Sequence, residues 1–297
     1  MLYAATLVAP EDAVFLPETV VTAAIEPLGA RVTGRHTLAD KAIDLVIEAP
    51  EGLTAELRAA AEASVFHFPL DICVQPWAGR KKMLLVADMD STIIGCECLD
   101  ELADFAGVKA EVAAITERAM RGELEFEAAL RERVAMIAGL PLADLQLCYD
   151  ERVRLNPGAR TLARTMAAYG ARCLLVSGGF TFFAEKVAEA AGFHAASANW
   201  LEVADGALTG RVGEPILGRE AKLRQLREQT TALGLDPSQT LAVGDGANDL
   251  AMIEAAGLGV AYRAKPVVAA RAAARVGRTD LATLLYFQGY REEEFAA

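Results

Sequence analysis

The sequence predicts two units, a small ferredoxin-like α+β domain followed by a doubly wound parallel α/β domain. In residues 1–80, strand and helix patterns follow one another in the order βαββαβ, which is typical of a ferredoxin-like sandwich. From Met83 onward, short apolar runs alternate with long helical patterns. This second order is typical of a parallel sheet with helices on both faces.

The first unit contains four predicted strands and two predicted helices. The helices are recognised by apolar residues at helical spacing, and the first of them ends at Gly29. In chain order we predict a strand at Tyr3–Ala9, a helix at Glu18–Leu28, strands at Arg31–Thr37 and Ala42–Ala49, a helix at Leu53–Val65 and a strand at Asp71–Val74. The stretch Pro76–Lys82 reads as a linker, so we divide the chain into residues 1–80 and 81–297.

The second unit contains four apolar runs typical of strands buried on both faces. These runs are Met83–Ala87, Arg172–Val176, Thr240–Val243 and Leu258–Ala261, and long helices are predicted at Phe180–Ala191 and Glu220–Leu233. The insertion Leu99–Arg154 is mainly helical and is broken at Gly107, Gly122 and residues 139–141. It is too long for a plain crossover, so we predict a helical cap over about residues 93–156.

Composition and charge exclude several classes of protein. The chain has 29 Lys and Arg against 41 Asp and Glu, a net charge of −12, and no basic run, which excludes a nucleic-acid partner. No apolar run reaches the ~18 residues of a membrane helix, and the N-terminus lacks the basic region of a signal peptide. Five thinly spread cysteines favour reduced thiols. We therefore expect a cytoplasmic protein with no membrane partner.

Polar segments follow three of the four predicted strands of the second unit. In open α/β sheets, ligands bind at the carboxyl ends of the strands. Carboxylates, a hydroxyl and repeated glycines at these ends fit a site for a hard cation and an oxyanion. The segments are Asp88-Met89-Asp90-Ser91-Thr92, Ser177-Gly178-Gly179-Phe180 and Gly244-Asp245-Gly246-Ala247-Asn248-Asp249.

Acidic and glycine-rich segments of this kind also occur in other local structures and sites. Asp88 and Asp90 could be ordinary turn or capping residues. An EF-hand loop is excluded because Ile93 and Leu99 stand where glycine and glutamate are required. A dinucleotide loop is excluded because position 249 is not glycine, and no His–acid pair accompanies a serine nucleophile.

Taken in order, Asp88–Thr92, Ser177–Gly179, Lys222 and Gly244–Asp249 resemble motifs I to IV of the haloacid dehalogenase (HAD) superfamily. Within it, the chain resembles the phosphoserine phosphatase family from Met83 to about Leu285. The resemblance implies a HAD-like core with a helical cap. Residues 1–80 are similar in outline to amino-acid-binding, ACT-like regulatory domains, which often mediate dimer formation.

The resemblance implies a role for each motif carboxylate. Asp88 is expected to be the nucleophile that forms an aspartyl phosphate, and Asp90 the general acid and base. Mg²⁺ is expected as cofactor, held by Asp88, Asp245 and the backbone carbonyl of Asp90. Asp249 is expected to support the metal site. From their spacing alone, Asn248 and Asp249 could equally well be helix-capping residues as site residues.

The same resemblance implies a set of substrate-binding residues. Lys222, Ser177 and the Gly178 N–H are expected to hold the phosphate. Arg133 would bind a substrate carboxylate, Glu97 an ammonium group, and Asn248 is expected to contact substrate. From the residues alone, Lys222, Arg133 and Glu97 are more typical of solvated surface charges. The predicted substrate-binding set is Glu97, Arg133, Ser177, Gly178, Lys222 and Asn248.

The implied function is magnesium-dependent hydrolysis of O-phospho-L-serine to L-serine and phosphate, the last step of serine biosynthesis. Two alternatives stay open. One is a phosphotransferase that passes the phosphoryl group to another alcohol such as homoserine, because the choice of acceptor depends on cap geometry. The other is a non-catalytic amino-acid sensor. A homodimer formed through residues 1–80 is the one macromolecular partner we expect.

Overall fold

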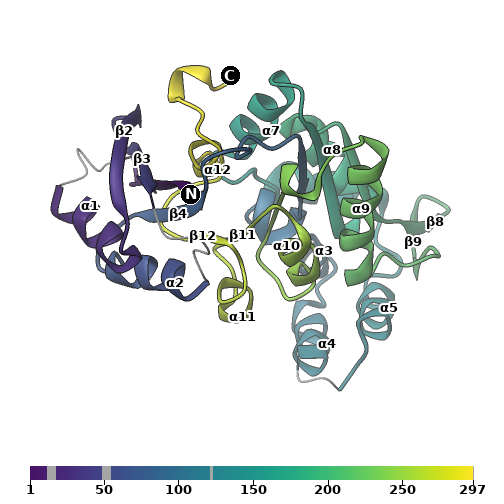
Figure 1. Cartoon of the computed structure of the whole chain (residues 1–297). Helices are drawn as coiled ribbons and strands as arrows, with labels where there is room; N and C mark the ends of the chain where they lie inside the picture. The colour runs from purple at the N-terminus through teal and green to yellow at the C-terminus, as the bar shows by residue number, and fades with distance from the viewer. Residues whose placement is uncertain (12–17, 49–54, 121–122, 297) are drawn as a thin grey trace.

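The computed structural model describes residues 1–11, 18–48, 55–120 and 123–296, and it confirms the predicted fold class (Figure 1). The N-terminal unit follows the predicted βαββαβ order. Positions 49, 53 and 54 of the predicted elements lie outside the described residues. The elements are β1 (Leu2–Val8), α1 (Glu18–Ile25) with a 3₁₀ turn at Glu26–Leu28, β2 (Arg31–Ala39), β3 (Ala42–Glu48), α2 (Ala55–Ser64) and β4 (Asp71–Pro76).

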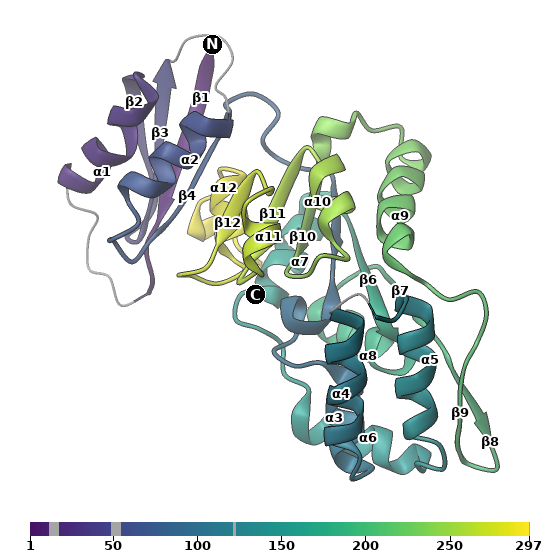
Figure 2. The same cartoon turned by 90° about the horizontal axis from the view of Figure 1, so that it is seen from below.

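The N-terminal sheet is antiparallel, with strand order β2-β3-β1-β4. Its register places Thr6 of β1 opposite Asp44 of β3 and Cys73 of β4. Alternate residues such as Leu7 and Leu45 are buried against α1 and α2, which both lie on one face of the sheet (Figure 2). Because side chains alternate between the two faces along each strand, these apolar residues lie on the face of the sheet that the helices cover.

The second unit is built on a six-stranded parallel sheet of order β12-β11-β10-β5-β6-β7. All four predicted strands are confirmed. The two edge strands were not predicted, because one is short and the other consists of small and polar residues. The strands are β5 (Leu84–Ala87), β6 (Arg172–Phe180), β7 (Ala195–Asn199), β10 (Thr240–Gly244), β11 (Leu258–Tyr262) and β12 (Ala274–Val276).

Helices cover both faces of this sheet. Leu84 and Val86 of β5 pack with Leu226 and Met252 on one face of the sheet. Leu85 and Ala87 face the larger core on the other side. This alternation within one apolar run is the arrangement expected of a strand buried on both sides. The helices are α7 (Ala159–Ala168), α8 (Thr181–Ala191), α9 (Arg219–Ala232), α10 (Leu250–Ala255), α11 (Pro266–Ala269) and α12 (Thr283–Phe287), with 3₁₀ turns at Pro237–Gln239 and Glu292–Glu294.

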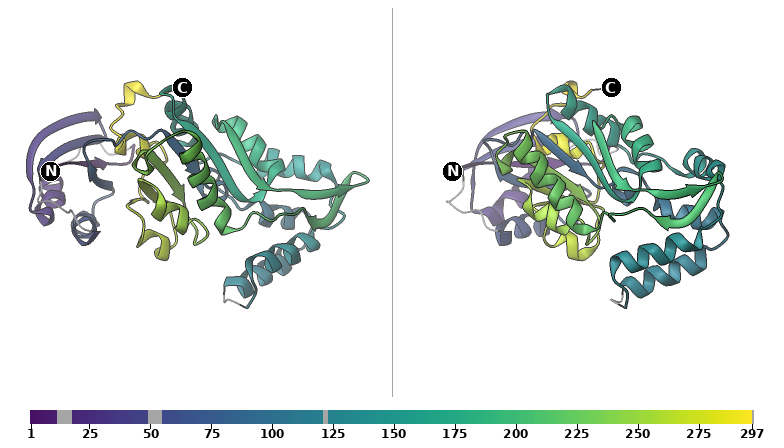
Figure 3. Two further views of the ribbon diagram at one scale, coloured as in Figure 1. Left: turned by 45° about the vertical axis from the view of Figure 1, so that its right-hand side comes forward. Right: turned by 90° about the vertical axis from the view of Figure 1, so that its right-hand side faces the viewer.

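The predicted helical insertion lies between β5 and β6 and forms the cap. It contains α3 (Cys98–Phe105), α4 (Lys109–Met120), α5 (Phe126–Met136) and α6 (Leu142–Arg152). A hairpin of β8 (Leu201–Ala204) and β9 (Ala207–Val212) packs against α5 and projects at the end of the molecule opposite the N-terminal unit (Figure 3). We did not predict this hairpin, although its turn, Asp205-Gly206 with positive φ at both residues, is a known hairpin signal.

The two units touch through polar contacts. The Asp71 carboxylate at the start of β4 accepts hydrogen bonds from the backbone N–H groups of residues 277–279, at 2.9–3.2 Å, and from the Thr279 hydroxyl at 2.6 Å. Arg80, between the sheets, forms a buried ion pair with Asp44. The division at residues 80 and 81 stays a prediction. Among the described residues, no helix is long and apolar enough to cross a membrane.

Candidate active site

The site lies at the carboxyl end of the parallel sheet, where β5 runs into a tight turn at Met89–Ile93, in which Asp90 and Ser91 have non-helical backbone angles. Asp88 is buried at this point, and its N–H donates to the Val243 carbonyl of the neighbouring strand at 3.0 Å. Ser91 adopts a left-handed conformation with φ 56°. Such a conformation is uncommon outside glycine and is concentrated at functional sites.

Lys222 of α9 joins two of the carboxylates. Its Nζ lies 2.5 Å from Asp88 Oδ1 and 2.5 Å from Asp249 Oδ1, and all three side chains are buried. Burial lowers the pKa of Lys222, but the two carboxylates outweigh this effect and the pKa is raised. Lys222 is therefore a charged group inside the site, and the interpretation of a solvated surface lysine is wrong.

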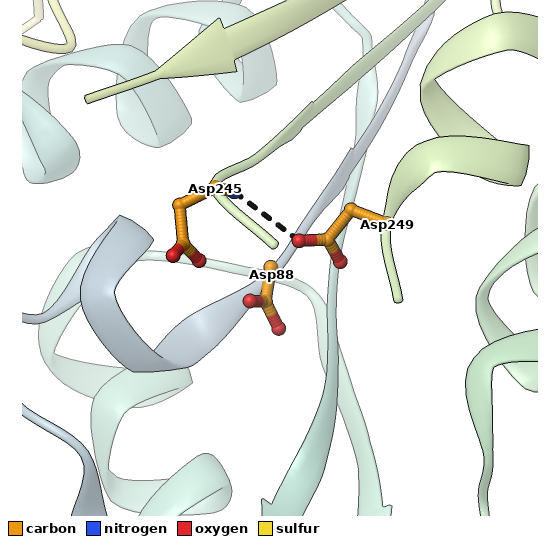
Figure 4. A group of neighbouring side chains, drawn as sticks. All are labelled: Asp88, Asp245 and Asp249. Atoms are coloured by element: carbon orange, nitrogen blue, oxygen red, sulfur yellow. Dashed lines mark hydrogen bonds between the residues drawn. The ribbon is translucent and has the colours of Figure 1, made fainter. Parts of the chain in front are cut away.

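Asp249 organises the loop after β10. Its Oδ2 accepts the N–H groups of Asp245 at 3.2 Å and Gly246 at 2.9 Å, as the dashed line in Figure 4 marks for Asp245. It stands at the N-cap position of α10, but its side chain makes no capping hydrogen bond. The capping interpretation of Asp249 is therefore wrong, and its carboxylate instead faces Asp88 and Asp245 (Figure 4).

The three carboxylates suit a hard divalent cation. Asp88, Asp245 and Asp249 each offer an oxygen within 4.8 Å of the others. Burial, followed by the charge of Asp249, raises the pKa of both Asp88 and Asp245, and the neighbouring lysine charges do not offset this effect. All-oxygen donors and excess negative charge are what Mg²⁺ requires, so the residues fit this ion.

The side chain of Asp90 points away from this cluster. Its Oδ1 accepts the Cys98 N–H at 2.9 Å, and its Oδ2 accepts the Ser177 hydroxyl at 3.0 Å. Ser177 Oγ in turn accepts the Gly179 N–H at 2.8 Å. Burial raises the pKa of Asp90 despite these donors. A carboxyl group with a raised pKa can carry a proton, and Asp90 differs from Asp88 in its partners, which are a backbone N–H and a hydroxyl where Asp88 has the Lys222 ammonium.

A cavity of about 700 Å³ lies between the sheet and the cap. Glu97 faces it, accepting the Ser91 hydroxyl at 2.6 Å, and burial together with the charge of Asp90 raises the pKa of Glu97 to about 7. Arg133 of α5 lines the same cavity, where burial lowers its pKa against the opposing effect of Asp100 and Glu97. The cap thus brings a basic group, Arg133, and two acidic groups, Glu97 and Asp100, to the cavity that Asp88 and Asp90 also line.

Nine of the ten predicted site residues border this cavity or the small cleft beside it, and the tenth, Asp249, contacts Lys222. Ser177 and Lys222 line the cleft, which the ring of Phe126 closes from the cap. A Cβ at Gly178 would lie 3.5 Å from that ring. The remaining predicted residues line the larger cavity: Asp88, Asp90, Glu97, Arg133, Gly178, Asp245 and Asn248. Their proximity agrees with the predicted roles, which stay predictions.

Lys265 is a charged cavity residue that was not predicted from the sequence. Lys265 follows β11, its side chain lines the cavity, and its backbone N–H donates to the Asp245 carbonyl at 3.1 Å. Its positive charge opposes the raised pKa of Asp245. The signal was available, because ligands bind at strand ends and Lys265 stands just beyond the fourth predicted strand. That strand end carries no acidic or glycine-rich segment, so no site residue was predicted there.

A parallel sheet, a cap inserted after the first strand and a carboxylate–lysine cluster at the strand ends define a capped hydrolase. Residues 85–254 match the family model of haloacid dehalogenase-like hydrolases, and the chain belongs to this family. The family predicted from the four motifs is thereby confirmed.

Several of the similar proteins are phosphoserine phosphatases. That of Streptomyces coelicolor is 44% identical over 281 residues, which cover 93% of this chain and 68% of that protein. Phosphoserine phosphatase SerB2 of Mycobacterium tuberculosis is 41% identical over 86% of this chain and 63% of its own length. The solved structure of a probable phosphoserine phosphatase from Vibrio cholerae has a TM-score of 0.79 and 31% identity, covering 97% of this chain and 86% of that one.

Proposed function

We propose that this protein is a magnesium-dependent phosphatase that hydrolyses O-phospho-L-serine to L-serine and phosphate. One observation carries the proposal: the larger cavity is lined by Asp88 on the sheet side and by the oppositely charged Glu97 and Arg133 on the cap side, and Lys222, paired with Asp88, lines the small cleft beside it. Phosphoserine carries a phosphate, an ammonium and a carboxylate, so each of its charged groups has a partner of opposite sign. The names of the similar proteins support the same substrate.

Asp88 is the proposed nucleophile. Its carboxylate oxygen attacks phosphorus, the bond to the serine oxygen breaks, and an aspartyl phosphate forms on Asp88. Lys222 stays protonated because two carboxylates raise its pKa, so it holds a fixed positive charge where the phosphoryl oxygens gather charge. Ser177 and the Gly178 N–H are placed to hold the remaining oxygens.

Asp90 is the proposed general acid and base. Its raised pKa lets it hold a proton, which it gives to the departing serine oxygen. The carboxylate left behind then accepts a proton from the water that attacks the aspartyl phosphate. The Cys98 N–H donates to Asp90 Oδ1 and keeps the carboxyl group in one orientation through both steps, also when the Ser177 hydroxyl turns from Asp90 to a phosphate oxygen.

Asp88, Asp245 and the backbone carbonyl of Asp90 are the proposed Mg²⁺ ligands, with Asp249 beside them. When bound, the ion supplies charge neutralisation between the nucleophile and the phosphate dianion. The protein's part is to keep these oxygens together, which Asp249 does through the N–H groups of Asp245 and Gly246.

Substrate choice is assigned to the cap and to Asn248. Arg133 offers a guanidinium fork for the serine carboxylate, and Glu97 a carboxylate for the ammonium group. Asn248 lines both the cavity and the cleft, where an amide can reach the phosphate end of the substrate.

Five free cysteines support a reducing, cytoplasmic setting, and an exposed β2 edge supports a homodimer. The reaction would then complete serine biosynthesis.

The test is phosphate release from phosphoserine, phosphothreonine, phosphohomoserine and sugar phosphates, each with MgCl₂ and with EDTA. We expect phosphoserine to be preferred and EDTA to abolish release. Products are then analysed with homoserine added. Phosphohomoserine formed at the expense of free phosphate would show a phosphotransferase, and turnover of none of these esters would revive the sensor interpretation.

A further inference from the structure

Two connecting segments join the cap to the core. The outgoing segment is residues 92–95, and the returning segment is residues 153–157. They meet in an isolated antiparallel bridge between Ile94 and Leu155. The Gly95 N–H also donates to the Arg154 carbonyl at 3.2 Å. This short piece of paired backbone is therefore one of the contacts that set the orientation of the cap, together with the Pro141–Ala207 bridge to the β8–β9 hairpin and the apolar core that the cap helices share.

Asn156 of the returning segment binds three successive carbonyl groups of the outgoing one. Its backbone N–H donates to Ile93 O at 2.8 Å, and its side-chain Nδ2 donates to Thr92 O at 2.8 Å and Ile94 O at 3.1 Å. Both donors of the side-chain amide are used in this way. No other side-chain type offers two such donors on so short a stem.

The carbonyls that Asn156 binds belong to the segment between the two functional parts of the site. Asp90 lies just before them and Glu97 just after them along the chain. The Thr92 hydroxyl donates to Asp245 Oδ1 at 3.4 Å, and the Ile94 N–H returns to the Met89 carbonyl at 3.0 Å. A shift of this segment would thus move the cap residues relative to the catalytic carboxylates.

We infer that Asn156 is a positioning residue, which sets the cap so that Glu97 and Arg133 face Asp88. It lies outside the residues that line the cavity, so it acts through the outgoing segment and not by touching substrate. The inference rests on the proposed function in one respect, the assignment of Glu97 and Arg133 to the substrate's charged groups. Displacement of a bound substrate by about 1 Å can cost ~100-fold in rate, so a small turn of the cap is sufficient.

The test compares two substrates in Asn156→Ala and Asn156→Asp. Both variants keep the backbone N–H, and both remove the two side-chain donors. We expect kcat/KM for phosphoserine to fall roughly tenfold or more, mainly through KM. For ethyl phosphate, which has neither charged group for the cap to bind, we expect a change of less than about threefold. Gln288→Ala is the matched control, because Gln288 is a buried amide that donates to the Leu284 carbonyl away from the cap.

Amide hydrogen exchange gives a second readout that needs no substrate. Exchange at Gly95 and at residue 156 should accelerate in both Asn156 variants and stay unchanged in Gln288→Ala. Equal losses on both substrates, or exchange at the wild-type rate, would overturn the inference. If the wild-type protein fails to hydrolyse phosphoserine, the proposed function fails, and exchange at these two amides still decides whether Asn156 holds the cap.

Discussion

Lys222 Nζ lies 2.5 Å from Asp88 Oδ1, so the ammonium group of α9 is bound to the carboxylate that ends β5. The two residues are 134 positions apart in the chain. Asp249 binds the same ammonium group, and the three buried charges depend on one another. Several of the expected properties of this protein follow from this pair and from the cavity beside it.

Replacing Lys222 with Met should both inactivate and destabilise the protein. It leaves Asp88 and Asp249 buried without their cation, and breaking a buried pair costs about 3–5 kcal/mol. Urea unfolding in EDTA measures this loss. Lys109→Met is the control, because Lys109 is an exposed lysine paired only at the surface, and its effect should stay within about 0.5 kcal/mol. Equal midpoints for the two variants would contradict the buried pair.

Asp88→Asn should keep the fold, because the two side chains are nearly isosteric, and should abolish the phosphoenzyme. The measurement is the intact mass of protein quenched during turnover of phosphoserine, in which the wild type gains one phosphoryl group. Asp205→Asn in the β8–β9 turn serves as control and should behave as wild type. Full turnover by Asp88→Asn, with deamidation excluded by its mass, would show that another group is the nucleophile.

Arg133→Ala should weaken phosphoserine binding selectively. Loss of a charge-assisted contact predicts a rise in KM of about tenfold or more for phosphoserine. Phosphoethanolamine lacks the carboxylate, so its KM should change little. Arg131→Ala on the same helix is the control, since Arg131 pairs with Glu127 and Glu214 at the surface. A similar rise for both substrates would mean that Arg133 supports the cap or the phosphate instead.

The pKa of Glu97, raised to about 7, predicts a pH-dependent KM. Below this pH the carboxyl group is protonated and neutral, so it no longer attracts the substrate ammonium, and KM for phosphoserine should rise as pH falls. Above pH 7 the carboxylate is charged and KM should be low. Glu97→Gln should remove this dependence. Phosphoglycolate, which has no ammonium group, should show no such change in the wild type, and the same change there would assign it to another group.

A chain that starts at Gly79 should keep its activity and lose stability. Every proposed catalytic residue lies beyond Gly79, so kcat for phosphoserine should stay within a few-fold of the full chain. The truncation removes the Asp71 carboxylate from the N–H groups of residues 277–279 and the Asp44 partner of Arg80, so its thermal midpoint should fall. A folded, soluble truncation without activity would show that the N-terminal unit contributes to the site.

The fold followed closely from local patterns. Met83–Ala87 was predicted as a buried strand because every residue in it is apolar, and the structure has β5 at Leu84–Ala87. The helices were predicted because their apolar residues repeat at helical spacing. The edge strand β7, Ala195–Asn199, escaped prediction because an edge buries less apolar surface and so needs no apolar run. The β8–β9 hairpin was not predicted, although its Asp-Gly turn is a recognised hairpin signal in the sequence.

The sequence by itself determined the strand ends that carry chemistry, since Asp88, Ser177 and Asp245 each follow a buried apolar run, and the order of these segments indicated the family. Only the tertiary structure decided that Lys222 is buried and that Asp249 binds backbone N–H groups instead of capping a helix. The physical reason is that periodicity along a chain reports the burial of a segment. A contact between α9 and β5 depends instead on the order of strands in the sheet and on which face each helix covers, and no local pattern encodes these.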